Sequence, residues 1–428
     1  MKRKDIIEFE IGSMEFGGES STLIGKRKVK MKGGITGQKV KAIVKKARSE
    51  KAEVKLLEVV ENSPIETEET CAHFGQCGGC SILSVPYEKQ LEIKSEQVLK
   101  LFEEQDIRGF EFLGIEGSPD ERVYRNKMEY TFGDEVKGGP LTLGMHKKGR
   151  HLDIITVDDC RLVDEDFIKV LTSTVEYFGQ KELPYYRINS HQGFLRNLVV
   201  RKGVNTNQLM VNIVTTTQID FDMTEYKDMI LNLGTKAEVV SILHTINDGL
   251  ADAVNCDELR VLHGRDYIEE VVLDLRFKIS PFSFFQTNTK GAEKLYTIAR
   301  EFVGDHEGKV LFDLYSGTGT IGQVMASAAK QVYGIELIEE AVVAANQNAK
   351  LNGLDNCEFI AGDVAETIKK VKDKPDIIIL DPPRSGVSPK ALDYVIRFNA
   401  PEIIYVSCNP KTMVENLDVL LAHGYTVD

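Results

Sequence analysis

The sequence predicts an α/β protein in three parts: a small N-terminal β-barrel, a central α+β region with a cysteine cluster, and a C-terminal doubly wound parallel sheet. Three observations predict it. Strand-like and helical patterns alternate after about residue 265, three cysteines gather within ten residues, and short apolar runs separated by glycine turns fill the first 60 residues. The predicted domains are 1–60, 61–264 and 265–428.

Composition places limits on the class of protein. A chain of 428 residues is long enough for each part to bury its own core. No apolar run approaches the roughly 18 residues of a membrane helix, and the charged start leads into no signal-peptide core. We therefore expect a cytoplasmic protein without a membrane partner or an obligate protein partner. Seven cysteines, unevenly spaced, favour metal binding or catalysis over a disulfide framework.

The N-terminal part is basic although the chain is acidic. Residues 1–60 contain 15 Lys and Arg against 8 Asp and Glu, which is a net charge of +7. Because the whole chain has a net charge of −13, the remaining residues have a net charge of −20. Strand-like pieces such as 39–44 and 52–60 recur between glycine turns, which is typical of a small barrel of the oligonucleotide-binding kind. A basic module on an acidic body indicates a delimited contact with a polyanion, with a solvated charged face as the alternative.

A loop at 61–70 leads into the cysteine cluster. Three thiols follow at spacings of five and two residues, and a fourth cysteine lies far along the chain; they are Cys71, Cys77, Cys80 and Cys160. Four thiolates suit either an iron–sulfur cluster or tetrahedral zinc, and spacing alone does not separate the two.

The region after the cluster predicts one helix and a set of basic groups. An apolar stripe over 86–105 is typical of an amphipathic helix that packs on its neighbours. Further on, strand-like pieces occur at 198–201 and 209–214. Nine basic side chains, as a set, are candidate phosphate contacts: Arg125, Lys127, His146, Lys147, Lys148, Arg150, Arg196, Arg201 and Lys202.

The C-terminal part shows the clearest alternation. Predicted strands lie at 309–314, 331–335, 357–360, 376–380 and 403–407. Predicted helices lie at 320–329, 338–351, 389–398 and 411–421. Such alternation means right-handed crossovers and a doubly wound, Rossmann-like sheet.

A glycine loop follows the first of these strands. Gly317, Gly319 and Gly322 satisfy the dinucleotide fingerprint, so a nicotinamide-dependent oxidoreductase is one interpretation. However, Asp313 opens the loop, and an acidic residue there better suits the ammonium group of S-adenosylmethionine. Glu336, which ends the second strand, is then placed to bind the ribose.

Two further strand ends bear reactive groups. The fourth strand ends in Asp381-Pro382-Pro383-Arg384, where the prolines hold Asp381 rigidly just outside the sheet. The fifth delivers Cys408 in a Ser-Cys-Asn-Pro sequence. A core thiol is the alternative for Cys408, but beside a methyl donor it suggests covalent catalysis.

Together these motifs resemble the RNA uracil-5-methyltransferases of the RumA/TrmA type, which make 5-methyluridine in ribosomal or transfer RNA. The resemblance covers nearly the whole chain, including a TRAM-like barrel at 1–60 and a Ser-Phe-Phe-Gln-Thr-Asn stretch at 283–288. It implies a [4Fe-4S] cluster in preference to zinc, on Cys71, Cys77, Cys80 and Cys160. It also implies that Gln286, Tyr315, Glu336 and Asp381 contact S-adenosylmethionine and that Cys408 is the nucleophile.

The resemblance implies a mechanism as well. Addition of the Cys408 thiolate at carbon 6 of uracil makes carbon 5 nucleophilic, so that it can attack the methyl group. The target base must be unstacked, which favours a loop or unpaired RNA. Phe284 or Phe285 is a candidate for stacking on it, with core packing expected for at least one of the two.

One departure bears on that mechanism. The resemblance implies a glutamate that removes the carbon-5 proton, in a motif near the carboxyl terminus. The sequence ends at residues 424–428 before such a motif, and Glu415 does not match its position. Either the sequence is truncated, or deprotonation is impaired.

Three functions therefore stand. The first is an RNA uracil-5-methyltransferase, with 23S ribosomal RNA favoured over transfer RNA because the basic TRAM-like part is present. The second is a catalytically impaired iron–sulfur RNA-binding protein. The third, an oxidoreductase, is disfavoured by the Asp-Pro-Pro-Arg sequence and the cysteine cluster.

Overall fold

A computed structural model describes residues 1–68, 70–304 and 308–428. Its contacts divide the chain into two compact units, Met1–Gly117 with Val427–Asp428, and Ser118–Thr426. Glu69, in the predicted 61–70 loop, lies outside the described residues. The predicted boundary at 264 falls within the second unit, and the three-part division stays a prediction.

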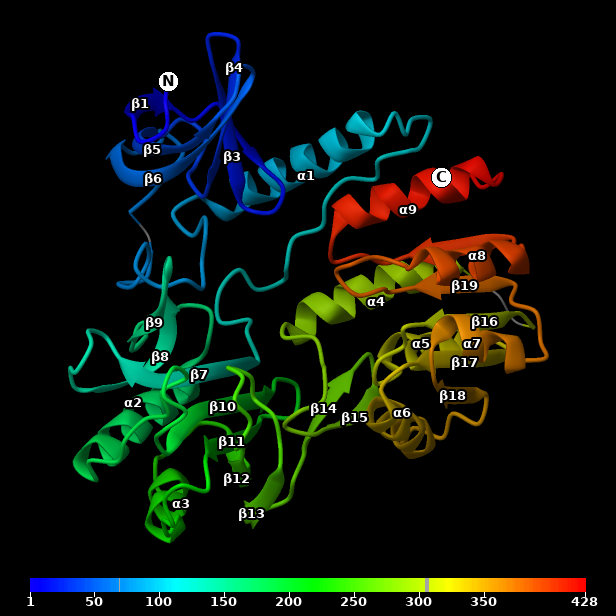
Figure 1. Cartoon of the computed structure of the whole chain (residues 1–428). Coiled ribbons are helices and arrows are strands. Elements are labelled where there is room, and N and C mark those ends of the chain that lie inside the picture. Colours follow the sequence, from blue (N-terminus) through cyan, green and yellow to red (C-terminus); the bar gives the residue numbers. More distant parts are fainter. Residues whose placement is uncertain (69, 305–307) are drawn as a thin grey trace. The chain divides into compact units, whose positions relative to one another are not determined.

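The first unit begins with a six-stranded sheet, drawn in blue in Figure 1. Its strands are β1 (Ile6–Glu10), β2 (Ser13–Glu15), β3 (Glu19–Ile24), β4 (Arg27–Lys32), β5 (Lys39–Ala47) and β6 (Lys51–Glu61). The order is β1-β5-β6-β4-β3-β2, so β1 and β2 form opposite edges. They are one stretch of chain that bends at Ile11 and Gly12, where Ile11 N donates to Gln38 O and Gly12 N to Ser21 O. This stretch of chain therefore connects the two edge strands, and closure of the sheet into a barrel stays a prediction.

Helix α1 (Tyr87–Glu104) confirms the helix predicted over 86–105. Lys100 on this helix approaches Glu15 on β2, with Nζ 3.8 Å from Oε1. Glu15 also pairs with Lys28 at 2.8 Å and Lys30 at 3.2 Å. Burial opposes ionisation of Glu15, but Lys28, Lys30 and a hydrogen bond from Ser21 lower its pKa to about 2. The first unit thus links its helix to its sheet through one carboxylate.

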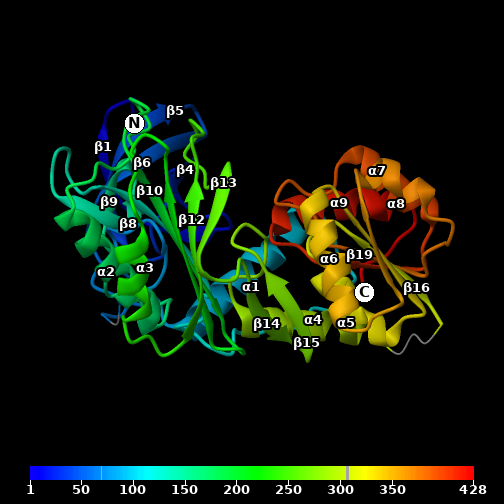
Figure 2. The same cartoon turned by 90° about the horizontal axis from the view of Figure 1, so that it is seen from below.

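The second unit contains a seven-stranded sheet of order β13-β12-β11-β10-β7-β8-β9. Its strands are β7 (Lys127–Asp134), β8 (Leu141–Lys147), β9 (Arg150–Ile155), β10 (Leu195–Gly203), β11 (Gln208–Thr215), β12 (Glu238–Ile246) and β13 (Glu258–Gly264). Helices α2 (Glu165–Gln180) and α3 (Thr224–Leu231) pack against it (Figure 2). A hairpin of β14 (Ile268–Val272) and β15 (Leu275–Ile279) leads out of it.

A five-stranded parallel sheet follows, and it confirms the predicted doubly wound fold. Its strands are β16 (Val310–Leu314), β17 (Gln331–Glu336), β18 (Cys357–Ala361), β19 (Ile377–Leu380) and β20 (Glu402–Tyr405), in the order β18-β17-β16-β19-β20. The helices are α4 (Thr289–Val303), α5 (Thr320–Met325), α6 (Glu339–Leu351), α7 (Val364–Thr367), α8 (Pro389–Phe398) and α9 (Pro410–Ala422). From β16 to β18 the strands are added toward one edge of the sheet, and β19 and β20 are added toward the other edge. Sheets of this kind bind ligands at the point between β16 and β19 where that order reverses.

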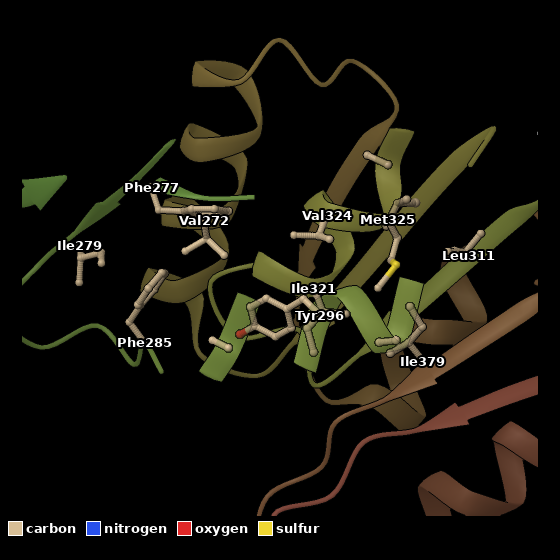
Figure 3. Close-up of a cluster of buried hydrophobic side chains, with 14 of the residues drawn as sticks. Val272, Phe277, Ile279, Phe285, Tyr296, Leu311, Ile321, Val324, Met325 and Ile379 are labelled. Atoms are coloured by element: carbon tan, nitrogen blue, oxygen red, sulfur yellow. The ribbon is translucent and has the colours of Figure 1, made fainter. Parts of the chain in front are cut away.

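Alternate residues of these strands face two different cores. Leu311 and Ile379 pack with α4 and α5, as Figure 3 shows around Tyr296 and Met325. Phe312, on the opposite face, packs in a second core with residues of α7, α8 and α9. Burial on both faces explains why the sequence of these strands is almost continuously apolar.

The end of β20 differs from the prediction. The strand ends at Tyr405, two residues before the predicted Ser407. Ser407 Oγ accepts a hydrogen bond of 3.1 Å from Asn409 N, so the backbone already turns there toward α9.

Among the described residues, no helix combines the length and apolarity that crossing a bilayer requires.

Candidate active site

The predicted cofactor residues lie at one edge of the parallel sheet. Tyr315, Glu336 and Asp381 follow or end β16, β17 and β19, which are neighbours in register. Because the strands are parallel, their carboxyl ends share this edge. The structure therefore brings together three residues that are up to 66 positions apart in the sequence.

The glycine loop between β16 and α5 turns through left-handed backbone. Tyr315, Gly317 and Gly319 have φ of 66°, 54° and 72°. A Cβ on Gly319 would also lie 2.6 Å from the ring of Phe359, so glycine is required there for two reasons. The loop orients Glu336, whose two carboxylate oxygens accept hydrogen bonds of 3.0 Å from Gly317 N and Ile338 N.

Asp313 is fully buried beneath this loop. Its Oδ2 accepts a hydrogen bond of 2.9 Å from Gly322 N, while Oδ1 has no hydrogen-bond partner among the described residues. Burial, and then the charges of Asp381 and Glu336, raise the pKa of Asp313 to about 7. A buried acceptor without a donor is costly. A cationic ligand group would supply the missing donor, and the ammonium of S-adenosylmethionine fits this requirement.

Asp381 and Gln286 join the same group through α4. Burial raises the pKa of Asp381 to about 6. The Gln286 side chain lies beside the hydroxyl group of Tyr296 on α4, and the pKa of Tyr296 is raised by burial and then by the charges of Asp381 and Asp313. Gln286 is thus held near both acids. The sequence analysis missed Tyr296, because nothing distinguishes it in the sequence from a core aromatic residue.

Cys408 is exposed, in the turn between β20 and α9. The alternative of a buried core thiol is therefore wrong. Its neighbour Asn409 caps α9 and donates from Nδ2 to Arg384 O at 2.8 Å. Thr412 Oγ1 donates to the same carbonyl at 3.4 Å. These bonds tie the cysteine turn to the Asp-Pro-Pro-Arg turn, so the two motifs share one edge of the site.

The two adjacent phenylalanines have different environments. Phe285 is 8% exposed, and its ring centroid lies 5.8 Å from that of Phe277 in the core. Phe284 is 71% exposed. The expectation that at least one of the two packs in the core is confirmed for Phe285, and Phe284 is the one with a free ring face.

The basic residues proposed as phosphate contacts also separate into groups. Several already bind carboxylates: Lys147 with Glu135, Arg150 with Asp153, and Lys202 with Asp164 and Asp166. Arg196 is buried and donates to three backbone carbonyl groups. Lys127 is likewise paired with Glu129. Of these side chains, only Arg196 and Lys202 are both largely buried and satisfied by the protein, which favours a structural role for those two.

The predicted cluster cysteines fall in both units. Cys71, Cys77 and Cys80 lie in one loop of the first unit, whereas Cys160 belongs to the second. Gly79 N donates to Cys77 Sγ at 3.3 Å, and burial, with Cys71 nearby, raises the pKa of Cys77. No group of three or more His, Cys, Asp or Glu side chains in the described ranges is arranged around a metal position. The donor chemistry fits iron or zinc, and the metal stays a prediction.

Comparison with known proteins places the chain in a family. The family described as tRNA (Uracil-5-)-methyltransferase matches residues 86–428. A relative from Clostridium tetani, named an uncharacterized RNA methyltransferase, is 56% identical over 428 residues, which is 100% of this chain and 94% of the relative. A relative of the same description from Caldanaerobacter subterraneus is 49% identical, over 100% and 95% of the two chains.

A solved structure supports the fold. It is the tRNA (uracil-54, C5)-methyltransferase of Pyrococcus abyssi in complex with S-adenosyl-L-homocysteine, with a TM-score of 0.74, 24% identity, and coverage of 96% of this chain and 93% of that one. The chain therefore belongs to the tRNA (uracil-5-)-methyltransferase family of S-adenosylmethionine-dependent RNA methyltransferases.

Proposed function

We propose that the protein transfers a methyl group from S-adenosylmethionine to carbon 5 of a specific uridine in RNA, through a covalent bond between Cys408 and the base. The observation that carries this proposal is the exposed Cys408 thiol in a turn bound to the Asp-Pro-Pro-Arg turn. An accessible thiol at the carboxyl edge of the sheet, next to acids that suit a cationic donor, is what covalent methyl transfer to a base needs.

The acids at the sheet edge bind and orient the cofactor, which supplies an electrophilic methyl group. Asp313, whose Oδ1 has no partner among the described residues and which lies near Asp381, would hold the ammonium group. Gln286, beside Tyr296, would lie near it. Glu336, oriented by two backbone N–H groups, accepts from the ribose hydroxyls. Tyr315, in left-handed backbone, begins the glycine loop that would enclose the cofactor.

Cys408 makes the base reactive. Its thiolate bonds to carbon 6, and the electron pair of the C5–C6 double bond moves onto carbon 5 and the adjoining carbonyl oxygen. Carbon 5 would then form a bond to the methyl group of the donor, while the bond from that methyl group to the sulfonium sulfur breaks and S-adenosylhomocysteine leaves. A general base, or water in its place, then takes the proton from carbon 5. The electron pair of that C–H bond re-forms the C5–C6 double bond, and Cys408 leaves carbon 6 as a thiolate. Phe284, with its exposed ring, is the candidate for stacking on the unstacked base.

We further propose that Cys71, Cys77, Cys80 and Cys160 hold a [4Fe-4S] cluster, with a role in structure and RNA contact. Four thiolates are suitable ligands, and three of these cysteines share one loop. Anaerobic reconstitution with iron and sulfide should give a brown protein with about four iron atoms per chain. Cys77→Ser should lower that content. A colourless protein with one zinc per chain would overturn the assignment.

For the RNA, we favour 23S ribosomal RNA because of the basic β1–β6 module. Transfer RNA is the second candidate, which the family description and the substrate of the P. abyssi protein favour. In vitro transcripts of both, offered together with labelled S-adenosylmethionine, should separate them. Label in the ribosomal transcript supports the first choice, and label in the transfer RNA supports the second.

The nucleophile is tested with a matched pair of cysteine variants. The protein is incubated with methyl-labelled S-adenosylmethionine and RNA, and a covalent protein–RNA product is sought on denaturing gels. Cys408→Ala should abolish both that product and methyl transfer. Cys256→Ala removes the other exposed thiol and should change neither. Methyl transfer that survives Cys408→Ala would contradict the mechanism.

A further inference from the structure

Two cations face each other across neighbouring strands of the seven-stranded sheet. Arg201 on β10 is paired in register with Lys127 on β7. Directly opposed like charges on a sheet are destabilising. Arg201 is only 4% exposed, so solvent does little to screen it. Such a pair is expected only where an anion compensates for it.

The protein compensates for little of this charge. Glu129 forms an ion pair with Lys127 and is the carboxylate that acts on Arg201. Arg125 adds a third positive charge, and its Nε donates to Lys127 O at 3.0 Å. The described residues give Arg125 and Arg201 no ion pair. Burial and then the charges of Arg201 and Arg125 lower the pKa of Lys127.

Arg201 contrasts with Arg196 on the same strand. The guanidinium of Arg196 stacks 4.2 Å from the ring centroid of Tyr186 and donates to the carbonyls of Asn247, Gly249 and Ala251. The guanidinium of Arg201 donates from Nη2 to Ser283 O alone, and its buried Nε has no partner among the described residues. The protein therefore satisfies the guanidinium of Arg196, whereas the guanidinium of Arg201 keeps at least one N–H donor, Nε, without an acceptor among the described residues.

The group formed by Arg125, Lys127 and Arg201 borders the loop that supplies Gln286. Ser283, which Arg201 contacts, precedes the exposed Phe284. Asn126, between Arg125 and Lys127, donates from Nδ2 to Gln286 O at 3.0 Å and from its backbone N to Thr287 O at 2.9 Å. The cation group therefore lies next to residues that we place in the active site.

We propose that Arg125, Lys127 and Arg201 form a binding site for an RNA phosphodiester next to the target uridine. This inference rests on the proposed function. A phosphate accepts several charge-assisted hydrogen bonds and neutralises opposed cations. Phe284, one residue from the Arg201 contact, offers a stacking surface for a base that an anchored backbone would bring to it. The carboxylate of the methyl donor is the other candidate anion.

The test compares Arg201→Met with Arg196→Met in the full chain. The probe is an RNA hairpin with uridines in its loop, and its affinity is measured over a range of salt concentrations. Arg201→Met should weaken RNA binding about tenfold and lower the steepness of log K against log salt by about 0.7, one lost phosphate contact on single-stranded RNA. It should leave the midpoint of thermal unfolding unchanged or higher, because an uncompensated buried cation is removed.

Arg196→Met should do the opposite. It removes the donor from three carbonyl groups, so it should lower the unfolding midpoint while leaving the salt dependence unchanged. Arg125→Ala, at a partly exposed side chain, provides a second variant and should also reduce the salt dependence. S-adenosylmethionine affinity, measured by calorimetry, should be the same in wild type and both Arg201→Met and Arg125→Ala.

Several outcomes would overturn the site. Unchanged RNA affinity and salt dependence in Arg201→Met would mean that water satisfies the guanidinium. Weaker binding of S-adenosylmethionine with normal RNA binding would assign the cations to the methyl donor. A lower unfolding midpoint for Arg201→Met would mean a structural role. Wild-type protein that neither binds nor methylates RNA would instead refute the proposed function itself.

Discussion

At the scale of single residues, the candidate site depends on acids that are expensive to keep charged. Asp313 is fully buried and Asp381 is partly buried, and the pKa of each is raised, mainly by burial. The sequence indicated these positions, because each lies where a predicted strand ends. It did not indicate Tyr296, which links Gln286 to the two acids, because that contact depends on how α4 packs.

Asp313→Asn tests this account of the acids. The pKa of Asp313 is about 7 in the folded protein against an ordinary value of 3.8. The folded state therefore keeps a proton that the unfolded chain loses, and stability falls as the pH rises between about 4 and 7. Asparagine keeps an acceptor for Gly322 N and removes the charge. We expect the variant to be more stable than wild type by about 4 kcal/mol at pH 8, at about 1.4 kcal/mol for each unit of the pKa difference, with the difference vanishing near pH 4.

The measurement is thermal unfolding of both proteins without S-adenosylmethionine across that pH range. Calorimetry should also show at least about tenfold weaker S-adenosylmethionine binding by Asp313→Asn, since a charge-assisted hydrogen bond is lost. A stability difference that does not change with pH would show that the Asp313 charge is not what costs stability.

At the scale of elements, the alternation of strand-like and helical patterns in the sequence was sufficient to predict the strands of the parallel sheet, but not helix α4 beside it or the end of β20. All five strands of the sheet lie where the apolar runs predict them, because strands buried on both faces are apolar throughout. Helix α4 was missed, since it precedes the alternating series and has a glycine, Gly291, in its first turn. The end of β20 was misplaced by two residues, because a side-chain hydrogen bond rather than apolarity ends it.

Gly334 on β17 shows how closely this sheet is packed. It pairs in register with Asp313, and a Cβ there would lie 2.1 Å from Phe359 and 3.0 Å from Ser316 Oγ. Gly334→Ala should therefore lower the free energy of unfolding by about 1–3 kcal/mol. Gly179→Ala is the control, because nothing lies within 4 Å of its Cβ in helix α2 and alanine should stabilise that helix by up to about 1 kcal/mol. Chemical denaturation measures both, and equal effects would refute the close packing.

At the scale of the whole molecule, charge is distributed unevenly between the parts. Residues 1–60 have a net charge of +7 within a chain of −13. Within the sheet of the first unit, some lysines are neutralised, such as Lys39 by Glu8 and Glu61, and Lys41 by Glu58. Lys45 and Lys55 are exposed, and the described residues give them no ion pair. The sequence predicted the basic module, whereas only the strand pairings show which lysines are already paired.

Replacing Lys45 and Lys55 together by Gln tests the electrostatic role of that module. The double variant should lower the steepness of log K against log salt for RNA by about 1.4, two phosphate contacts on single-stranded RNA. The matched control replaces Lys39 and Lys41, whose charges already face glutamates, and should have a smaller effect. Equal effects of the two double variants would mean that the module acts only through its overall charge.

The central claim is that a methyl group enters carbon 5 of uridine, and loss of the hydrogen at that carbon measures it directly. RNA labelled with tritium at carbon 5 of its uridines is incubated with the protein and S-adenosylmethionine. Tritium released into water is then compared with methyl groups gained by the RNA. The account predicts one tritium released for each methyl group incorporated, and neither event in Cys408→Ala. Methylated RNA that is free of protein and keeps all its tritium would place the methyl group on another atom and contradict the account. Methyl and tritium retained together in a covalent adduct with Cys408 would instead mean that removal of the carbon-5 proton is impaired.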